Sequence, residues 1–236
     1  MDYVISAPPV VAVPVAGGGM FPVRRIFCVG KNYADHVKEM GGDAKADPPV
    51  FFTKPADAVV ACGAEPGRIP YPPGTSNLHY EGELVVALGA GGRQLKDRHA
   101  AGALIFGQAA GCDLTRRDLQ AAAKKAGGPW DAAKAFDASA PIGLIGRIAD
   151  YPPARFDGAR LVTCVNDDVR QDAGLTEMIW TVPEILIALS MLFELKAGDL
   201  VFTGTPAGVG PVAPGDRVEV GIGELPALKF AIMEPA

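Results

Sequence analysis

The segment that most constrains the fold of this chain is Glu81-Gly82-Glu83, followed by the apolar run 84–88. The run has the length and composition of a buried strand. Side chains two positions apart on a strand share a face, so Glu81 and Glu83 point the same way, with Cα atoms roughly 6.6 Å apart. Two like charges at the mouth of a buried strand repel each other, and loss of water strengthens the repulsion. The fold must neutralise this pair or leave it facing water.

Short strands are expected along most of the chain. The residue pattern predicts strands at 25–29, 50–54, 58–62 and 161–165, and a small-residue apolar element at 104–112. Helical character is expected at 33–40 and 118–126. The clearest helix is 183–195, where Thr181 suits the cap, Pro183 the first turn, and Gly198 lies just past the end. The predicted organisation is an irregular N-terminal arm along the surface, residues 1–21, and a single domain over 22–236.

Composition excludes several classes of protein. A chain of 236 residues that is 49% hydrophobic and 21% charged suits one large globular domain with a sizeable core. A net charge of −5 gives no bulk electrostatic reason for nucleic-acid binding. Residues 3–23 are uncharged, but their prolines and the glycines at 17–19 oppose a signal or membrane helix. The four widely spaced cysteines favour core thiols in a reducing compartment. We therefore expect a cytoplasmic protein without a membrane or nucleic-acid partner.

A third acid raises the prospect of a metal site. Asp113 follows the small-residue run 106–112, so it can also lie at the end of a buried element. Three carboxylates converging at strand ends suit a hard divalent cation such as Mg²⁺, which often binds few protein carboxylates plus the substrate. Such a cation would remove the repulsion between Glu81 and Glu83. The spacing alone is equally compatible with a solvated strand end and an acidic turn.

His36 and Glu39 form a second candidate constellation in the stretch KNYADHVKEM, residues 31–40. Their spacing places both on one face of a short helix. A histidine beside a carboxylate can take a proton from water. The alternative is an exposed amphipathic turn with an incidental pair.

Two further segments could hold an oxyanion. Lys134 has apolar neighbours in sequence, so it could stabilise a buried negative charge or extend to the surface as most such lysines do. The loop TGTPAGVG, residues 203–210, lacks the phosphate-loop lysine and the dinucleotide fingerprint. It is either a tight turn or a loop whose backbone N–H groups, with the Thr205 hydroxyl, hold an oxyacid.

Six motifs in chain order resemble the fumarylacetoacetate hydrolase family. They are FCVGKNYADHVKEMG, FTKPADAVV, NLHYEGELVVALG, GCDLTRRDLQ, PWDAAKAFDASAPIG and DLVFTGTPAGVGPV. The resemblance runs from about residue 22 to the C-terminus, and it is strongest to the short fumarylpyruvate hydrolases and acylpyruvases. It implies an α+β, β-rich fold, a mixed β-sandwich roll with a few peripheral helices, and usually a homodimer.

The resemblance also implies roles for the site residues. Glu81, Glu83 and Asp113 match the metal-binding acids of the family, with Mg²⁺ or Mn²⁺ as the ion. His36 and Glu39 match a catalytic dyad on a segment, 31–47, that orders when substrate binds.

The remaining implied contacts are with the substrate. Lys134 matches a catalytic lysine that stabilises charge near the scissile carbonyl. The implied substrate-binding residues are Lys31, Tyr33, Gly204 and Thr205. Two departures from the family pattern stand out, because Lys31 replaces a common arginine and Gly82 replaces a residue that is often apolar. Lysine lacks the forked, bidentate geometry with which arginine contacts a carboxylate.

The activity implied for the domain 22–236 is metal-dependent hydrolysis of the C–C bond of an acylpyruvate. The expected substrate is a small 2-oxo acid, fumarylpyruvate, which would give fumarate and pyruvate as in gentisate-type aromatic catabolism. Two alternatives stay open at this point. One is an oxaloacetate decarboxylase or tautomerase on the same metal-enolate site, and the other is a non-catalytic metal- or oxyacid-binding protein.

Overall fold

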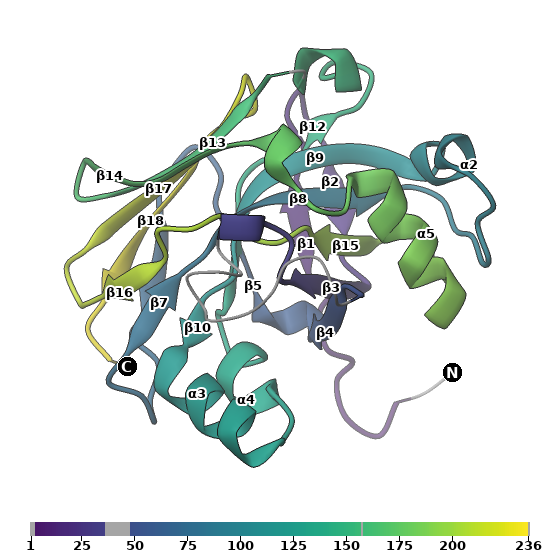
Figure 1. Cartoon of the computed structure of the whole chain (residues 1–236). Helices are drawn as coiled ribbons and strands as arrows, with labels where there is room; N and C mark the ends of the chain where they lie inside the picture. Colours follow the sequence, from purple (N-terminus) through teal and green to yellow (C-terminus); the bar gives the residue numbers. More distant parts are fainter. Residues whose placement is uncertain (1–2, 36–47, 157, 236) are drawn as a thin grey trace.

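A large mixed sheet forms the centre of the molecule (Figure 1). The structure is a computed structural model that describes residues 3–35, 48–156 and 158–235. The strand order in this sheet is β4-β3-β15-β8-β9-β11-β5, and β12 also pairs with β9. The strands are β3 Arg25–Gly30, β4 Val50–Lys54, β5 Val59–Ala61, β8 Gly82–Leu88, β9 Ile105–Cys112, β11 Ala140–Ile142, β12 Gly146–Arg147 and β15 Asp199–Phe202. The strands predicted at 25–29, 50–54 and 58–62 are therefore confirmed, the last as a shorter strand.

A second sheet packs against the first and lies on the left of Figure 1. Its order is β14-β13-β17-β18-β6, with β6 Gly67–Pro70, β13 Arg160–Val165, β14 Asp168–Gly174, β17 Arg217–Ile222 and β18 Leu228–Met233. One apolar cluster joins the two sheets, since it contains Leu84 and Ala110 from the first and Val218 and Phe230 from the second. Burial of apolar area between two layers is the main stabilising term of such a fold. The architecture is the β-rich sandwich roll that the sequence predicts.

A small third sheet brings the ends of the long strands together. Its order is β10-β7-β16, with β7 Leu78–Tyr80, β10 Thr115–Arg116 and β16 Gly210–Val212. Strand β7 leads into β8 through Glu81, and β10 follows β9 after Asp113 and Leu114. The acids singled out in the sequence therefore lie at the junction of this small sheet with the central one.

The helices are short and peripheral. They are α2 Arg98–Gly102, α3 Arg117–Ala126, α4 Asp131–Lys134 and α5 Val182–Leu192, with 3-10 turns η1 Ala56–Ala58, η2 Pro153–Phe156 and η3 Leu175–Glu177. Helix α5 has the predicted Thr181 cap, whose side chain forms a capping box with Glu184. It ends at Leu192, three residues before the predicted end, because Phe193 is already extended. Among the described residues no helix combines the length and apolar composition needed to cross a membrane.

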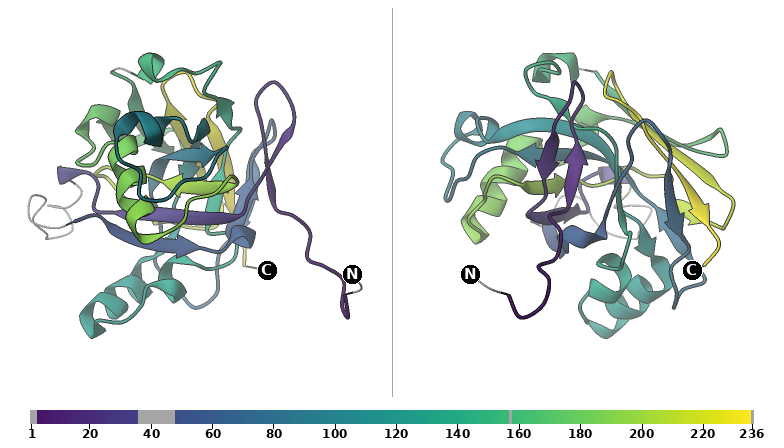
Figure 2. Two further views of the ribbon diagram at one scale, coloured as in Figure 1. Left: turned by 90° about the vertical axis from the view of Figure 1, so that its right-hand side faces the viewer. Right: turned by 180° about the vertical axis from the view of Figure 1, so that it is seen from behind.

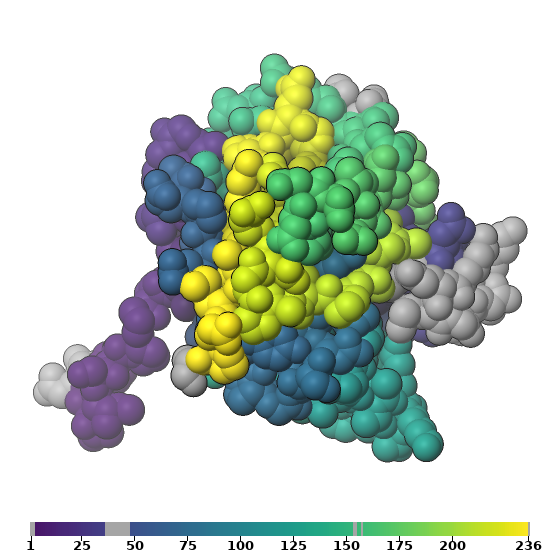
Figure 3. Space-filling view, turned by 90° about the vertical axis from the view of Figure 1, so that its left-hand side faces the viewer, coloured from purple at the N-terminus to yellow at the C-terminus, as the bar shows by residue number. Residues whose placement is uncertain are grey.

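The N-terminal segment differs from the prediction of an irregular arm along the surface. Strands β1 Ala12–Pro14 and β2 Met20–Pro22 form an antiparallel hairpin, and Val13 and Phe21 are buried in the core. Glycines 17–19 have positive φ and make its turn, so the irregular assignment is wrong for 12–21. Residues 3–10 extend away from the body rather than along it (Figures 2 and 3), with Val4 and Ile5 exposed. The division into an arm and a single domain over 22–236 stays a prediction.

Candidate active site

Three buried acids meet where β8 begins and β9 ends. Glu81 directly precedes β8, Glu83 is its second residue, and Asp113 directly follows β9. One carboxylate oxygen from each acid lies within 4.8 Å of the others. The Asp113 N–H donates to the Glu81 carbonyl at 2.8 Å, so the antiparallel pairing of β8 and β9 brings the third acid to the first. The convergence predicted from the sequence is confirmed.

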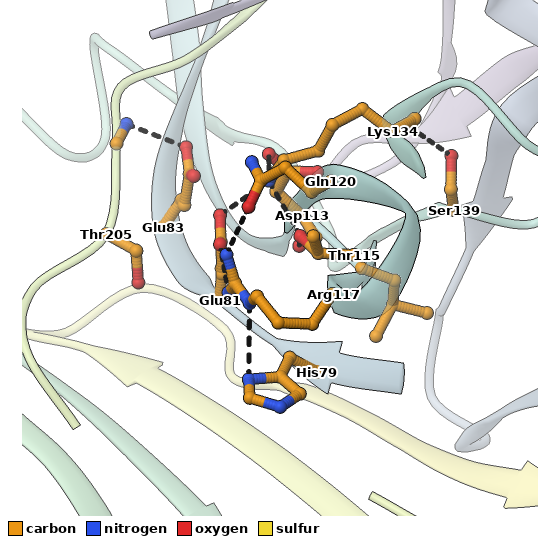
Figure 4. A network of polar contacts seen from close by, with 12 residues as sticks. His79, Glu81, Glu83, Asp113, Thr115, Arg117, Gln120, Lys134, Ser139 and Thr205 are labelled. Atoms are coloured by element: carbon orange, nitrogen blue, oxygen red, sulfur yellow. Dashed lines mark hydrogen bonds and ion pairs between the residues drawn. The ribbon is translucent and has the colours of Figure 1, made fainter. Parts of the chain in front are cut away.

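Three cationic side chains of the described residues neutralise two of these acids, and Figure 4 shows two of the three, Lys134 and Arg117. Lys134 Nζ lies 2.7 Å from Glu81 Oε2 and 2.7 Å from Asp113 Oδ2. Lys54 Nζ lies 2.8 Å from Asp113 Oδ1, and Arg117 Nη2 lies 2.6 Å from Glu81 Oε1. Charge pairs are strong when water is excluded, and Lys54 and Lys134 are almost fully buried. Buried lysines and an arginine of the protein therefore reduce the repulsion among the acids at the start of β8.

Lys134 is the centre of this cluster and does not extend to the surface, so the surface alternative is wrong. Besides the two carboxylates, its ammonium donates to Thr115 Oγ1 at 2.7 Å, which completes its three donors. Burial alone would lower the pKa of Lys134, but the charges of Asp113 and Glu81 outweigh it and raise that pKa above its ordinary value. Lys134 is thus a permanent cation beside the acids.

Glu83 has no such partner. Its Oε2 accepts a 2.7 Å hydrogen bond from the Gly204 N–H, and no cation of the described chain forms an ion pair with it. Burial, together with the negative charges of Asp113 and Glu81, raises the pKa of Glu83 well above its ordinary value. The chemistry of the donor set, three carboxylates with oxygens at short range, fits a hard divalent cation. Glu83 is the acid whose charge such a cation would compensate.

Arg117 links the acids to residues that the sequence analysis missed. Its Nη1 donates to Gln120 Oε1 at 2.7 Å, and its Nε donates to His79 Nδ1 at 3.3 Å. Arg117 and Gln120 lie three apart at the start of α3, a spacing that puts them on one face of a helix. This spacing in the sequence could have predicted that Arg117 and Gln120 lie side by side. Lys54, on β4, gave no such signal, because its position beside Asp113 depends on the strand order.

The glycine-rich loop 203–209 lies against the acids. Gly204 has φ +97°, and a Cβ there would lie 2.7 Å from the Asn32 Cβ, so the position requires glycine. Its N–H is used by Glu83, as described above. The Thr205 hydroxyl donates to the Gly82 carbonyl at 2.8 Å. The Gly204 N–H and the Thr205 hydroxyl are therefore engaged within the protein, and contact of this loop with substrate stays a prediction.

Two further predicted residues, Lys31 and Tyr33, lie just after β3. Tyr33 is buried, and its hydroxyl has no hydrogen-bond partner among the residues described here. It lines a pocket of about 350 Å³ together with residues such as Glu177 and Pro206. Lys31 is exposed and has φ +62°. His36, Glu39 and most of the segment 31–47 lie outside the described residues, so the proposed dyad and its ordering with substrate stay predictions.

Sequence comparisons agree on one family. The model for the fumarylacetoacetate (FAA) hydrolase C-terminal region matches residues 25–233. Oxaloacetate tautomerase YcgM of Escherichia coli (strain K12) is 43% identical over 205 residues, which cover 85% of this chain and 89% of that protein. The mitochondrial oxaloacetate tautomerase FAHD1 of Homo sapiens is 39% identical over 212 residues, covering 90% of this chain and 93% of that protein.

Solved structures show the same fold. Fumarylpyruvate hydrolase from Pseudomonas aeruginosa, in complex with Mn²⁺ and pyruvate, has a TM-score of 0.95 and 42% identity, covering 99% of this chain and 100% of that one. The yeast protein ynq8, a fumarylacetoacetate hydrolase family protein, has a TM-score of 0.77 and 31% identity, covering 91% of this chain and 95% of that one.

Proposed function

The chain belongs to the fumarylacetoacetate hydrolase family, and from this premise we propose that it hydrolyses the C–C bond of an acylpyruvate with a divalent cation at Glu81, Glu83 and Asp113. The observation that carries the proposal is the buried cluster of three carboxylates, in which Glu83 has no cationic partner among the described residues. The fumarylpyruvate hydrolase that matches almost the whole chain was crystallised with Mn²⁺ and pyruvate. Fumarylpyruvate is therefore the proposed substrate, and fumarate and pyruvate are the products.

The residues of the cluster suit this chemistry. Mg²⁺ or Mn²⁺ held by the acids would act as a Lewis acid toward negative charge on a bound 2-oxo acid. Lys134 and Arg117 both contact Glu81, and preorganised cations in a dry site stabilise a developing oxyanion. Glu39, oriented by His36, would take a proton from the attacking water. In this proposal Lys31, Tyr33, Gly204 and Thr205 contact the substrate.

A second candidate function is oxaloacetate tautomerisation. It is favoured by tautomerases that match most of this chain, including those of Escherichia coli and Homo sapiens at 43% and 39% identity. Tautomerisation moves a proton between carbon and oxygen, and it requires no attacking water. The same acids and cations would serve both reactions, so the need for an activated water distinguishes them.

Steady-state kinetics of the wild type and Glu39→Gln test the assignment. With Mn²⁺ or Mg²⁺ present, we expect the wild type to have a higher kcat/KM for fumarylpyruvate than for oxaloacetate. Glu39→Gln should lose roughly 10²–10⁴-fold in hydrolysis, the usual contribution of a positioned general base. Any decarboxylation of oxaloacetate should fall much less, because it needs a stabilised enolate more than a general base. Tautomerisation also needs a group that takes a proton from carbon, so it should fall with hydrolysis. A higher kcat/KM for oxaloacetate than for fumarylpyruvate would replace hydrolase by tautomerase. Absence of turnover on either substrate would leave a binding protein.

The proposal includes assembly and location. We propose a cytoplasmic homodimer, in keeping with the resemblance described above. The exposed apolar side chains of the N-terminal segment, including Tyr3, Val4 and Ile5, are surface that a second copy could cover. Light scattering after gel filtration should give twice the 24.5 kDa of one chain, and a single-chain mass would contradict it.

A further inference from the structure

Glu81 and Glu83 are joined by one residue, Gly82, and side chains from other elements hold both of its peptide groups. The Gly82 N–H donates to Gln171 Oε1 at 3.0 Å, and its carbonyl accepts from the Thr205 hydroxyl at 2.8 Å. The N–H belongs to the peptide from Glu81, and the carbonyl belongs to the peptide to Glu83. The two hydrogen bonds therefore fix the backbone on which both carboxylates are mounted.

Gln171 contacts both the Gly82 N–H and the Thr205 hydroxyl that holds the Gly82 carbonyl. It lies in β14 of the second sheet and is 1% exposed. Its Nε2 donates to Thr205 Oγ1 at 2.8 Å and to the Pro206 carbonyl at 2.9 Å. A turned amide would place its NH₂ group against the Gly82 N–H and its carbonyl oxygen against that of Pro206. A buried polar group with a complete set of partners holds one orientation, because any other leaves groups unsatisfied.

Gly82 is the residue that this arrangement requires. A Cβ at position 82 would lie 2.1 Å from Thr163 Oγ1 and 3.1 Å from Gln171 Oε1. A Cβ at the first distance would displace the Thr163 side chain, so glycine suits this position as the chain is packed here. The Thr163 side chain also lies next to Gly82, but its buried hydroxyl has no hydrogen-bond partner among the described residues. The two neighbours of Gly82 thus differ, since only Gln171 holds it through hydrogen bonds.

We propose that Gln171 is a positioning residue of the metal site. It acts through Gly82 and Thr205, and it sets the separation of Glu81 and Glu83 and ties both to the loop that carries Gly204. The inference rests on the proposed function, since it takes these acids as ligands of a divalent cation. Groups that orient metal ligands typically contribute 10–100-fold to metal affinity or activity. Gln171 makes the second sheet part of the site, although its strand carries none of the candidate ligands.

Calorimetric titration of Mn²⁺ into EDTA-treated, dialysed protein tests the inference. Gln171→Met keeps the length of the side chain and removes all three hydrogen bonds, so Mn²⁺ affinity should fall about 10–100-fold. The matched control is Thr163→Val, which removes a hydroxyl without a partner beside the same glycine, and its affinity should equal that of the wild type. Thermal unfolding without metal shows whether each variant is folded when it is titrated.

A second pair of variants keeps the inference falsifiable if Gln171→Met does not fold. Thr205→Ser retains the hydroxyl between Gln171 and Gly82, whereas Thr205→Val removes it. Serine should retain the wild-type Mn²⁺ affinity, and valine should lower it. The double variant Gln171→Met with Thr205→Val should lose less than the product of the single effects, because both act on one glycine.

The outcomes separate the two proposals. A wild type that does not bind Mn²⁺ would overturn the proposed function and the positioning role together. A wild type that binds, with Gln171→Met binding equally well, would overturn the positioning role alone. Equal affinities of Thr205→Ser and Thr205→Val would do the same.

Discussion

Single residues of the acidic cluster differ in what balances their charge. Asp113 contacts two buried lysines, whereas Glu83 accepts only a backbone N–H within the described structure. A raised pKa means that the ionised carboxyl is less stable in the fold than in the unfolded chain. The two acids should therefore respond in opposite ways to loss of their charge, although both serve the same proposed cation.

Glu83→Gln should abolish Mn²⁺ binding without lowering the free energy of unfolding of the metal-free protein. The amide oxygen can still accept from Gly204, and the uncompensated buried charge is gone. Calorimetric titration and urea unfolding in EDTA measure the two effects. Retained Mn²⁺ affinity would contradict the role of Glu83 as a ligand.

Asp113→Asn should also abolish Mn²⁺ binding, but it should lower the free energy of unfolding by about 3–5 kcal/mol, the usual cost of breaking a buried ion pair. The asparagine leaves Lys54 and Lys134 without their shared counter-charge. Urea unfolding in EDTA, beside Glu83→Gln as the matched neutral variant, gives the difference. Equal stabilities of the two variants would show that the lysines do not depend on Asp113.

The three acids and Lys134 could be predicted from the sequence, and the other two cations, Lys54 and Arg117, could not. Glu81 and Glu83 share a face because the two-residue period of a strand is local. Lys54 and Arg117 reach the cluster from β4 and α3, whose places depend on the strand order. Gln171 was missed for the same reason, since it comes from the second sheet. Local patterns identify residue types, whereas non-local pairing decides which of them meet.

At the scale of elements, the site residues lie at strand ends, and a buried asparagine links the ends of β3 and β15. Asn32, two residues after the end of β3, donates to the carbonyls of Thr203 and Trp180 at 2.7 and 3.1 Å and accepts from the Trp180 N–H at 2.8 Å. It thereby fixes the end of β15 and the start of the loop that carries Gly204. Its position explains why β15 and β3 lie side by side up to the site.

Asn32→Ala should lower the free energy of unfolding by several kcal/mol, because each buried group left unsatisfied costs about 1–3 kcal/mol. It should also weaken Mn²⁺ binding through Gly204. Thr181→Ala, which removes only the cap of α5, is the control and should cost about 1 kcal/mol without changing Mn²⁺ affinity. Urea unfolding and calorimetric titration compare the two. An unchanged Mn²⁺ affinity in Asn32→Ala would show that the hydrogen bonds of Asn32 do not position the metal site.

Several elements were predictable, whereas β6, β14, β17 and β18 of the second sheet and the N-terminal hairpin were not. Strands β3, β4 and β13 and the cap of α5 follow from apolar runs and turn residues. The hairpin β1–β2 was missed, because its glycines and prolines break regular structure in most contexts. Here three glycines with positive φ form the turn, and burial of Val13 and Phe21 stabilises two short strands. Tertiary burial outweighs weak local propensity.

On the scale of the whole molecule, one core should make residues 22–236 a single cooperative unit. The apolar cluster between the sheets draws on both, and Gln171 adds polar contacts between them. Calorimetric unfolding of the metal-free protein should show one transition, with the calorimetric enthalpy equal to the van't Hoff enthalpy per cooperative unit. Two resolved transitions would divide the chain and contradict the predicted single domain.

The matched charges of the cluster have a consequence for how ligands arrive. The three acids and the three cations that surround them sum formally to zero. A divalent cation alone leaves an excess of two positive charges, which a dianion such as oxalate restores to electroneutrality. Cation and dianion should therefore be cooperative, each tightening the other by the same factor. Titration of Mn²⁺ with and without oxalate, corrected for the complex that the two form in solution, should reveal this reciprocal coupling. Loss of either ligand should then weaken the binding of the other.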